Sequence, residues 1–279
     1  MLAMYDTVIE PKVLFDTLNN SNWCAIDCRA SLTDEDLGRR TYVAGHIPGA
    51  VFADLAKDLS GPLVSGTSGR HPLPDAAELA KTFGRWGIDA DTQVVAYDAA
   101  NGVYAARAWW LLRWLGHAAV AVMNGGVAAW QAQGYPLRSG EEHRASRRFP
   151  SRSSLTQIVL VDDIVERPAT MDLLDARAEP RFRGEVEPID PVAGHIPGAR
   201  CLPFEANLDA QGRFLAPEAL RARFDAYMQS GKQLVCYCGS GVSACHNILA
   251  MRYAALPEAA LYPGSFSEWI QDPQRRVER

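Results

Sequence analysis

The sequence predicts an α/β fold of two tandem three-layer domains, each with a mainly parallel central sheet flanked by helices. Three observations lead to this prediction. The heptapeptide AGHIPGA occurs at residues 44–50 and again at residues 193–199. In the first copy, short apolar segments alternate with segments of helical periodicity. A chain of 279 residues is also long enough for two domains that each bury a core of their own.

The expected elements of the first copy alternate between helix and strand. Strands are expected where short apolar runs occur, at 22–27 (NWCAID), 94–98 (VVAYD) and 119–123 (AVAVM). Helices are expected where the apolar residues have helical spacing, at 11–20 (PKVLFDTLNN), 103–116 (VYAARAWWLLRWLG) and 126–134 (GVAAWQAQG). This alternation is typical of a parallel sheet covered by helices on both faces.

The second copy repeats landmarks of the first in the same order. Besides the heptapeptide, the matching pairs are CAIDCR at 24–29 with LLDAR at 173–177, VVAYDAANGVYAAR at 94–107 with LVCYCGSGVSACHN at 234–247, and GGVAAW at 125–130 with GSFSEW at 264–269. The repeat is too long for a solenoid, so it indicates two copies of one globular domain. We expect domains at 1–139 and 155–279, joined by a polar linker at 140–154.

Composition and charge exclude several classes of partner. A net charge of -5 with scattered Lys and Arg argues against binding to nucleic acid. No apolar run approaches the ~20 residues of a membrane span, and the early Asp6 and Glu10 are unlike a signal peptide. We therefore expect a cytoplasmic protein whose six cysteines are reduced thiols. Their spacing does not form a structural zinc site, and no metal is expected.

Cys238 is the candidate nucleophile because it stands where a predicted strand gives way to a Gly-Ser-Gly turn. In parallel α/β sheets, ligand sites lie at the carboxyl ends of the strands. Backbone N–H groups of the loop and the N-terminus of the next helix would then favour a thiolate. The donors are expected from Gly239, Gly241, Val242, Ser243 and Ala244. The first copy has Asp98 in place of Cys238 and is expected to be catalytically inactive.

Other uses of a cysteine loop fit the residues less well. A cysteine in an apolar run is often only a small buried residue. A Cys-x5-Arg phosphatase needs an arginine where this chain has Ala244, and a disulfide oxidoreductase prefers Cys-x-x-Cys to the Cys236-x-Cys238 pattern. A metal site with Cys245 and His246 is disfavoured because the far side of a helix does not face the loop. A sulfur carrier needs only a thiolate and a ring of donors.

The loop CGSGVSAC, the duplicated GHIPGA turn and the SEW near the C-terminus resemble the tandem-domain rhodanese-type sulfurtransferases over nearly the whole chain. The loop is closest to the CGSGVTAC of 3-mercaptopyruvate sulfurtransferases. The resemblance implies a cysteine that cycles through a persulfide, without a metal or organic cofactor. It also implies a small-molecule sulfur donor and a thiol or cyanide as acceptor, with thioredoxin as a candidate protein partner.

The resemblance further implies residues that bind the donor. Arg181 matches the first of two arginines that hold the donor carboxylate in the family, whereas residues 187–190 (EPID) stand where the second is expected. Arg183 or Arg177 is the candidate substitute. The loop residues Gly239 and Ser240 replace the cationic residues of thiosulfate-preferring members, which favours 3-mercaptopyruvate as donor.

A proposed Ser-His-Asp relay of the family would correspond to Ser240, His46 and Asp36. The alternative for each is a turn residue that satisfies local backbone groups. Arg70 and His71 are expected on the first domain, as residues at the entrance of the site. Two other functions stay open: transfer from thiosulfate through the same persulfide, and a non-catalytic persulfide carrier or interaction module. A phosphatase or arsenate reductase is a weaker alternative.

Overall fold

The computed structural model describes residues 4–99 and 101–279, and the chain divides into two compact units. The first unit comprises residues up to Gly61, Pro74–Leu155 and Ala210–Arg213. The second unit comprises Pro62–Leu73, Thr156–Asp209 and Phe214–Arg279. The segment with Arg70 and His71 therefore belongs to the second unit, whereas the sequence pattern predicted it on the first domain.

The first unit is built on a five-stranded sheet in the order β1-β5-β4-β2-β3, with every pair parallel. Its strands are β1 (Val8–Ile9), β2 (Trp23–Asp27), β3 (Val51–Phe52), β4 (Gln93–Tyr97) and β5 (Val120–Met123). The central strands β2 and β4 are buried along their whole length. Burial on both faces explains their continuous apolar runs.

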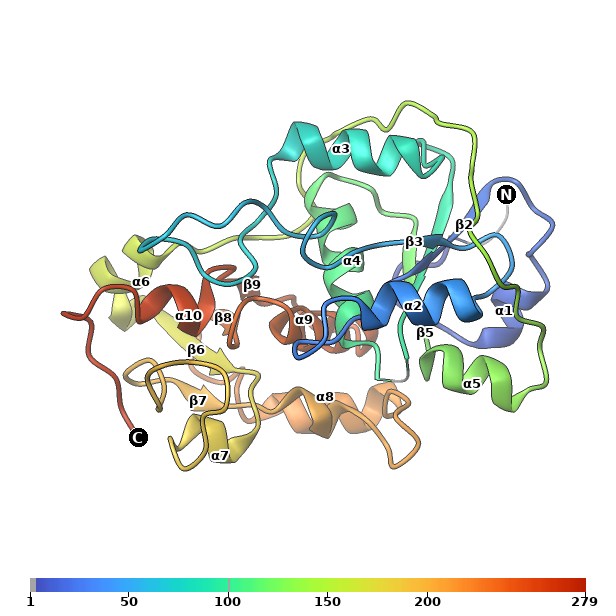
Figure 1. Cartoon of the computed structure of the whole chain (residues 1–279). Helices are drawn as coiled ribbons and strands as arrows, with labels where there is room; N and C mark the ends of the chain where they lie inside the picture. Colours follow the sequence, from blue (N-terminus) through green and yellow to red (C-terminus); the bar gives the residue numbers. More distant parts are fainter. Residues whose placement is uncertain (1–3, 100) are drawn as a thin grey trace. The chain divides into compact units, whose positions relative to one another are not determined.

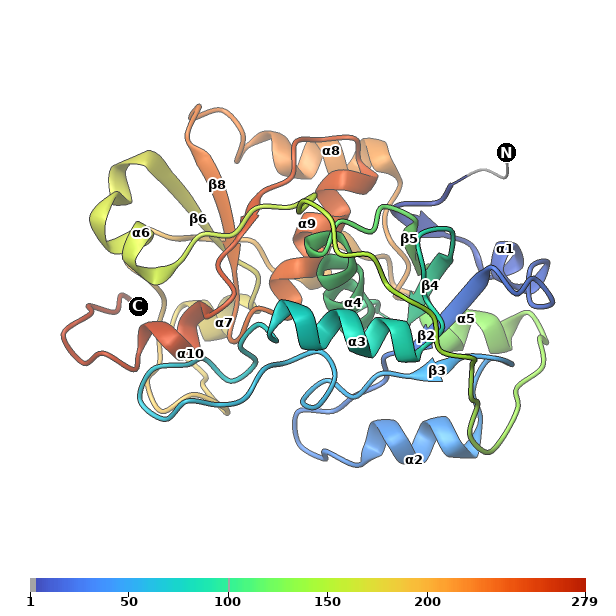
Figure 2. The ribbon, with the colours of Figure 1, turned by 90° about the horizontal axis from the view of Figure 1, so that it is seen from above.

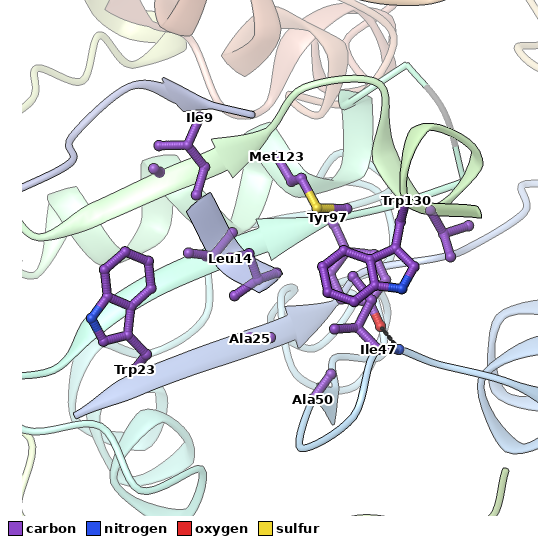
Figure 3. Close-up of a cluster of buried hydrophobic side chains, with 12 residues drawn as sticks. Ile9, Leu14, Trp23, Ala25, Ile47, Ala50, Tyr97, Met123 and Trp130 are labelled. Atoms are coloured by element: carbon purple, nitrogen blue, oxygen red, sulfur yellow. Dashed lines mark hydrogen bonds between the residues drawn. The ribbon is translucent and has the colours of Figure 1, made fainter. Parts of the chain in front are cut away.

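Helices cover both faces of this sheet. They are α1 (Pro11–Phe15), α2 (Leu37–Ala44), α3 (Ala76–Arg85), α4 (Val103–Trp114) and α5 (Gly126–Ala132). Leu14 of α1 and Trp130 of α5 lie over side chains of the central strands, among them Ala25 and Tyr97, in one buried cluster (Figure 3). Helices α3 and α4 lie on the other side of the sheet (Figure 2).

The second unit repeats this plan with a four-stranded parallel sheet in the order β7-β6-β8-β9. Its strands are β6 (Met171–Asp175), β7 (Arg200–Cys201), β8 (Gln233–Tyr237) and β9 (Ala260–Leu261). Its helices are α6 (Val161–Glu166), α7 (Glu179–Phe182), α8 (Pro217–Asp225), α9 (Ser243–Tyr253) and α10 (Ser265–Trp269), with short 3₁₀ helices at Pro168–Thr170 and Phe204–Asn207. Within this unit, α6 and α10 cover one side of β6 and β8 and α9 lies on the other (Figure 1).

The predicted α/β fold of two tandem domains is confirmed, as are the three strands and three helices expected in the first copy. The first helix is shorter than predicted because it ends at Phe15, after which Thr17 Oγ1 donates to the carbonyl oxygens of Val13 and Leu14. None of the helices within the described residues is long and apolar enough to cross a lipid bilayer.

Candidate active site

Cys238 follows the last residue of β8 and precedes the loop that leads into α9. Its residue surface is 2% exposed. The backbone N–H of Gly241 donates to its Sγ at 3.1 Å. A donor at this distance stabilises negative charge on sulfur, so the loop can hold either a thiolate or the terminal sulfur of a persulfide.

Backbone contacts fix the shape of this loop. Gly241 has φ of +76°, and a Cβ built on it would lie 2.3 Å from the carbonyl oxygen of Pro263. Only glycine fits both the conformation and the space. The carbonyl oxygens of Cys238 and Gly239 accept from Phe266 N at 3.0 Å and Ser267 N at 2.9 Å. The first turn of α10 therefore holds the start of the loop in place.

Ser265 completes this support and was not identified from the sequence. Its Oγ accepts the N–H of Cys238 at 3.1 Å and donates to the carbonyl oxygen of Tyr262 at 2.9 Å. Its φ is +56°, a left-handed value that is costly for a residue with a side chain. The first unit has Gly126 with the same φ at the matching position. The sequence contained one indication of this role: Ser265 stands where the first copy of the repeat has Gly126.

The corresponding loop of the first unit binds an anion from its own chain. Asp98 occupies the position of Cys238 and is 1% exposed. Its carboxylate accepts the backbone N–H groups of Gly102 at 2.9 Å, Tyr104 at 2.9 Å and Ala105 at 3.3 Å. The repeated strand-loop-helix unit is thus a site for negative charge.

Ser240 of the loop lies beside His71, with Ser240 Oγ 2.8 Å from His71 Nδ1. The segment that carries His71 is anchored within the second unit, because Arg70 N donates to Ser267 Oγ at 3.1 Å. Gly69 also packs closely, since a Cβ on it would lie 2.4 Å from the carbonyl oxygen of Gly264. A serine hydroxyl with an imidazole partner can move a proton.

His46, the histidine expected in the relay, has its contacts within the first unit. His46 is fully buried in the first unit, its Nδ1 lies 2.8 Å from the carbonyl oxygen of Tyr42, and its ring stacks on the Tyr42 ring. His195 has the same arrangement, 2.8 Å from the carbonyl oxygen of Phe182 and stacked on its ring. The histidine of the repeated turn is a structural residue in both copies, because its ring stabilises the turn.

Asp36, the acid expected in the relay, is an exposed residue of the first unit just before α2. Its side chain makes no capping hydrogen bond to α2, and its part in the relay stays a prediction.

Two guanidinium groups border the residue after the nucleophile. A Cβ built on Gly239 would lie 2.7 Å from Arg70 Nη2 and 3.7 Å from Arg181 Nη2. Arg70 forms an ion pair with Asp190. Arg181 contacts the same carboxylate at 3.1 Å and Glu187 at 2.8 Å. Arg181 was predicted for this place, and Arg70 was predicted only as a residue at the entrance.

The other two candidate arginines lie elsewhere. Arg183 has a side chain that is 49% exposed and pairs with Glu179 and Glu185 at 2.8 Å each, so it is a surface residue and not a ligand at the loop. Arg177 is buried, pairs with Asp175 at 2.7 Å and lies over the Phe266 ring. It stabilises the end of β6, as Arg29 does for β2 by pairing with Asp27.

The two carboxylates behind the arginines have shifted pKa values. Burial raises the pKa of Asp190, although the charges of Arg70 and Arg181 act in the opposite direction. Burial also disfavours ionisation of Glu187, but the backbone N–H of Asp190 and the Arg181 guanidinium hold its pKa below 4.5. When all four side chains are ionised, Arg70, Arg181, Glu187 and Asp190 together have no net charge.

Four of the other five thiols are not prepared for nucleophilic attack. Burial raises the pKa of Cys24 and of Cys201 to about 11. It also raises the pKa of Cys28 and Cys236. A thiol with a raised pKa is protonated at neutral pH and reacts slowly.

Neither a metal cluster nor the large cavity of the second unit competes with this site. No group of three His, Cys, Asp or Glu side chains within residues 4–99 and 101–279 is placed to hold a metal ion. The cavity, of about 840 Å³, is lined by Met171, at the start of β6, and by Ile164 and Trp269, but not by Cys238. It therefore lies at the opposite ends of the strands from the nucleophile.

Comparison with known proteins assigns the class. A family model described as a rhodanese-like domain matches residues 10–133 and 159–272, and the chain belongs to this family. A probable 3-mercaptopyruvate sulfurtransferase of Pseudomonas aeruginosa is 52% identical over 266 residues, covering 93% of each chain. A putative thiosulfate sulfurtransferase of Mycobacterium tuberculosis is 41% identical, covering 91% of this chain and 90% of the relative.

Solved structures agree with this assignment. The 3-mercaptopyruvate sulfurtransferase structure from Escherichia coli is 31% identical to this chain and superposes with a TM-score of 0.81. The match covers 94% of this chain and 100% of the Escherichia coli chain. Relatives named for both sulfur donors share the fold and most of the chain. The names alone therefore do not decide which donor this protein uses.

Proposed function

We propose that this protein is a sulfurtransferase that takes sulfur from 3-mercaptopyruvate onto Cys238 and passes it to a thiol or cyanide. The observation that carries the proposal is the environment of the Cys238 sulfur. Gly241 N–H donates to Sγ, the first unit holds a carboxylate in the same kind of loop, and Arg181 lies beside the next residue.

In the first step, the Cys238 thiolate attacks the sulfur of the donor. A sulfur–sulfur bond forms, the carbon–sulfur bond breaks, and pyruvate leaves as its enolate. The proton of the donor thiol then moves to the enolate carbon, giving pyruvate and a deprotonated persulfide. In the second step, cyanide or a thiolate attacks the outer sulfur, and Cys238 leaves as a thiolate. Both steps conserve charge.

Ser240 and His71 are the proposed route for the proton. Their contact of 2.8 Å places a hydroxyl and an imidazole two residues along the loop from the nucleophile. A pair of this kind can take the proton of the donor thiol and return it to the enolate. Arg181 orients the donor carboxylate, and the loop residues Gly239 to Ala244 provide the electrostatic environment for the sulfur.

Thiosulfate is the second candidate donor. The relative from Mycobacterium tuberculosis carries that name, and two guanidinium groups beside Gly239 could hold a dianion. Comparison of kcat/KM for the two donors decides between them. The domain at 1–139 is proposed to be inactive because Asp98 supplies no nucleophile, with residues 140–154 as linker and 155–279 as the catalytic domain.

We also infer a cytoplasmic location and a thiol acceptor from the cell's reducing pool, thioredoxin being one candidate. None of the six cysteines, all of which lie within the described residues, forms a disulfide, and reduced thiols suit a reducing compartment.

Mass spectrometry of the intact protein tests the proposal directly. Exposure to 3-mercaptopyruvate should add one sulfur atom to Cys238, and cyanide should remove it. The Cys238→Ser variant should fold normally and gain no sulfur. Sulfur gain by that variant, or none by the wild type with either donor, would refute the persulfide mechanism.

A further inference from the structure

We propose that Ser267 is a positioning residue of the reaction, whose hydroxyl holds the segment that carries His71 so that the imidazole stays in contact with Ser240. Ser267 belongs to α10, and its residue surface is 3% exposed. The inference rests on the proposed proton route through Ser240 and His71, and it specifies what holds the two side chains together.

Two hydrogen bonds connect Ser267 to the chain on either side of this contact. Its backbone N–H donates to the carbonyl oxygen of Gly239 at 2.9 Å, and Gly239 directly precedes Ser240. Its Oγ accepts the backbone N–H of Arg70 at 3.1 Å, and Arg70 directly precedes His71. One residue is therefore bonded next to both members of a pair whose side chains lie 2.8 Å apart.

The segment that carries His71 has little burial of its own before it reaches α10. Residues 62–67 are exposed to solvent, and Gly69 is the first buried residue after them. A Cβ built on Gly69 would lie 2.4 Å from the carbonyl oxygen of Gly264 and 2.9 Å from Ser267 Oγ. The Ser267 hydroxyl donates to that same carbonyl oxygen at 3.4 Å. Because exposed segments with few buried contacts open readily, loss of a bond at this point should loosen the position of His71.

The first unit provides an internal comparison, since it has the same backbone arrangement without the hydroxyl. Ala128 stands where the second unit has Ser267. The N–H of Ala128 donates at 3.1 Å to the carbonyl oxygen of Ala99, the residue after Asp98, as the N–H of Ser267 does to that of Gly239. Ala128 is exposed, whereas Ser267 is buried. The backbone arrangement therefore does not need the hydroxyl, which occurs in the unit that has the nucleophile.

The first experiment measures the rate of persulfide formation on Cys238 at saturating 3-mercaptopyruvate. Ser267→Ala should lower this rate about tenfold, the rate equivalent of one hydrogen bond. The loss should be smaller than that in His71→Ala, because the imidazole is displaced and not deleted. Ser230→Ala is the matched control and should leave the rate unchanged. Ser230 Oγ also accepts a backbone N–H, that of Lys232 at 3.2 Å, on an exposed part of the same unit.

A second pair of variants separates positioning from a general effect on stability. In a His71→Ala background, Ser267→Ala should lower the rate less than about twofold further, because the group that Ser267 positions is already absent. A tenfold loss in both backgrounds would overturn the proposal, and so would an unchanged rate in Ser267→Ala alone. The variant should fold normally, because Ala128 occupies the matching position of the first unit.

The His71 imidazole gives a readout that needs no turnover. In isotopically labelled protein without donor, its ring resonances in an NMR spectrum are assigned by their loss in His71→Ala. Ser267→Ala should shift them in the same direction as Ser240→Ala does, because both changes remove the contact between hydroxyl and imidazole. Unshifted resonances in Ser267→Ala would overturn the role of Ser267. Failure of the proposed function is a different result, in which the wild type gains no sulfur while the resonances still report the contact.

Discussion

At the scale of single residues, the structure shows a contact that the sequence motif around Cys238 does not reveal, between Ser240 and His71. Ser240 is nearly buried, at 6% exposure, and its hydroxyl lies 2.8 Å from the imidazole. Side chains that act as a unit lose their effect when either is removed. The pair should therefore behave as one functional group.

We expect Ser240→Ala and His71→Ala to lower kcat for 3-mercaptopyruvate by similar factors, about 100-fold each, because each removes the same proton route. The double variant should be no slower than the slower single variant. Multiplied losses in the double variant would show that the residues act independently. His46→Asn is a useful comparison, since loss of a buried structural histidine should lower thermal stability more than it alters the rate of the folded enzyme.

The sequence predicted the nucleophile and Arg181 because both stand in short motifs with fixed spacing. It placed His71 only at the entrance of the site and did not predict its contact with Ser240, because the histidine of the repeated turn was the more conspicuous candidate. Repetition was itself a sign of a structural role, because the first copy lacks the cysteine and still has the same turn. The pairing of Arg70 could not be predicted because its partner Asp190 is 120 residues away along the chain.

At the scale of elements, the loop after β8 requires glycine at position 241. Gly241→Ala would combine an unfavourable φ with a contact of 2.3 Å to the carbonyl oxygen of Pro263. We expect a loss of kcat/KM of about 100-fold, because the Gly241 N–H that contacts Cys238 would be displaced.

Gly231→Ala provides the control for this prediction. Gly231 has φ of +70°, but a Cβ at this position would meet nothing within 4 Å, so the substitution adds backbone strain without a clash. Its cost should be about 1 kcal/mol of stability, with normal turnover. Equal losses of activity in the two variants would contradict the importance of the loop shape.

The segment from α7 to Asp190 is held by buried ion pairs. Glu187, with a side chain 4% exposed, contacts Arg181 at 2.8 Å and Arg177 at 3.4 Å. Glu187→Gln should lower the free energy of unfolding at pH 7 by about 2 kcal/mol, because the buried Arg177 and the half-buried Arg181 lose a charged acceptor.

The effect should depend on pH in a defined direction. Because the folded protein lowers the pKa of Glu187, its stabilising contribution is complete above the ordinary value of 4.5 and is lost as the pH falls through the lower pKa of the folded state. Urea unfolding of wild type and Glu187→Gln, at neutral pH and at a pH below that ordinary value, measures this. Glu185→Gln, at an exposed surface pair, should show no comparable difference.

The main strands and the long helix α4 were predictable because their apolar segments are longer than those found in turns. Helices α2 and α3 were not predicted, although α3 begins after Asp75, whose side chain accepts the N–H groups of Ala77 and Glu78 as an N-cap. The extent of α1 was overestimated because helical spacing continues past Phe15, where Thr17 binds the preceding carbonyl groups.

At the scale of the whole molecule, the duplication predicts one reactive centre in each chain. The two units share a parallel sheet and a loop that binds negative charge, but only the second loop carries a thiol. The remaining thiols with shifted pKa values are protonated at neutral pH.

Complete loading with 3-mercaptopyruvate should therefore give one cyanide-labile sulfur per chain, and none in Cys238→Ser. Quantitative cyanolysis with measurement of thiocyanate provides the count. A value near two would indicate a second sulfur-carrying thiol. The Cys201→Ser variant should load like the wild type, because burial keeps that thiol protonated with a pKa of about 11.

The carboxylate of Asp98 has a consequence for turnover in the second unit. The Asp98 side chain accepts three backbone N–H groups, a setting that favours negative charge on its carboxylate. The Cys238 loop has one negative charge as a thiolate and one as a persulfide. The net charge that the backbone dipoles stabilise is therefore the same before and after sulfur transfer. Only its position changes, from Sγ of Cys238 to the outer sulfur of the persulfide. No reorientation of the loop is needed between the two half-reactions, so the rate should be governed by how donors and acceptors arrive and leave.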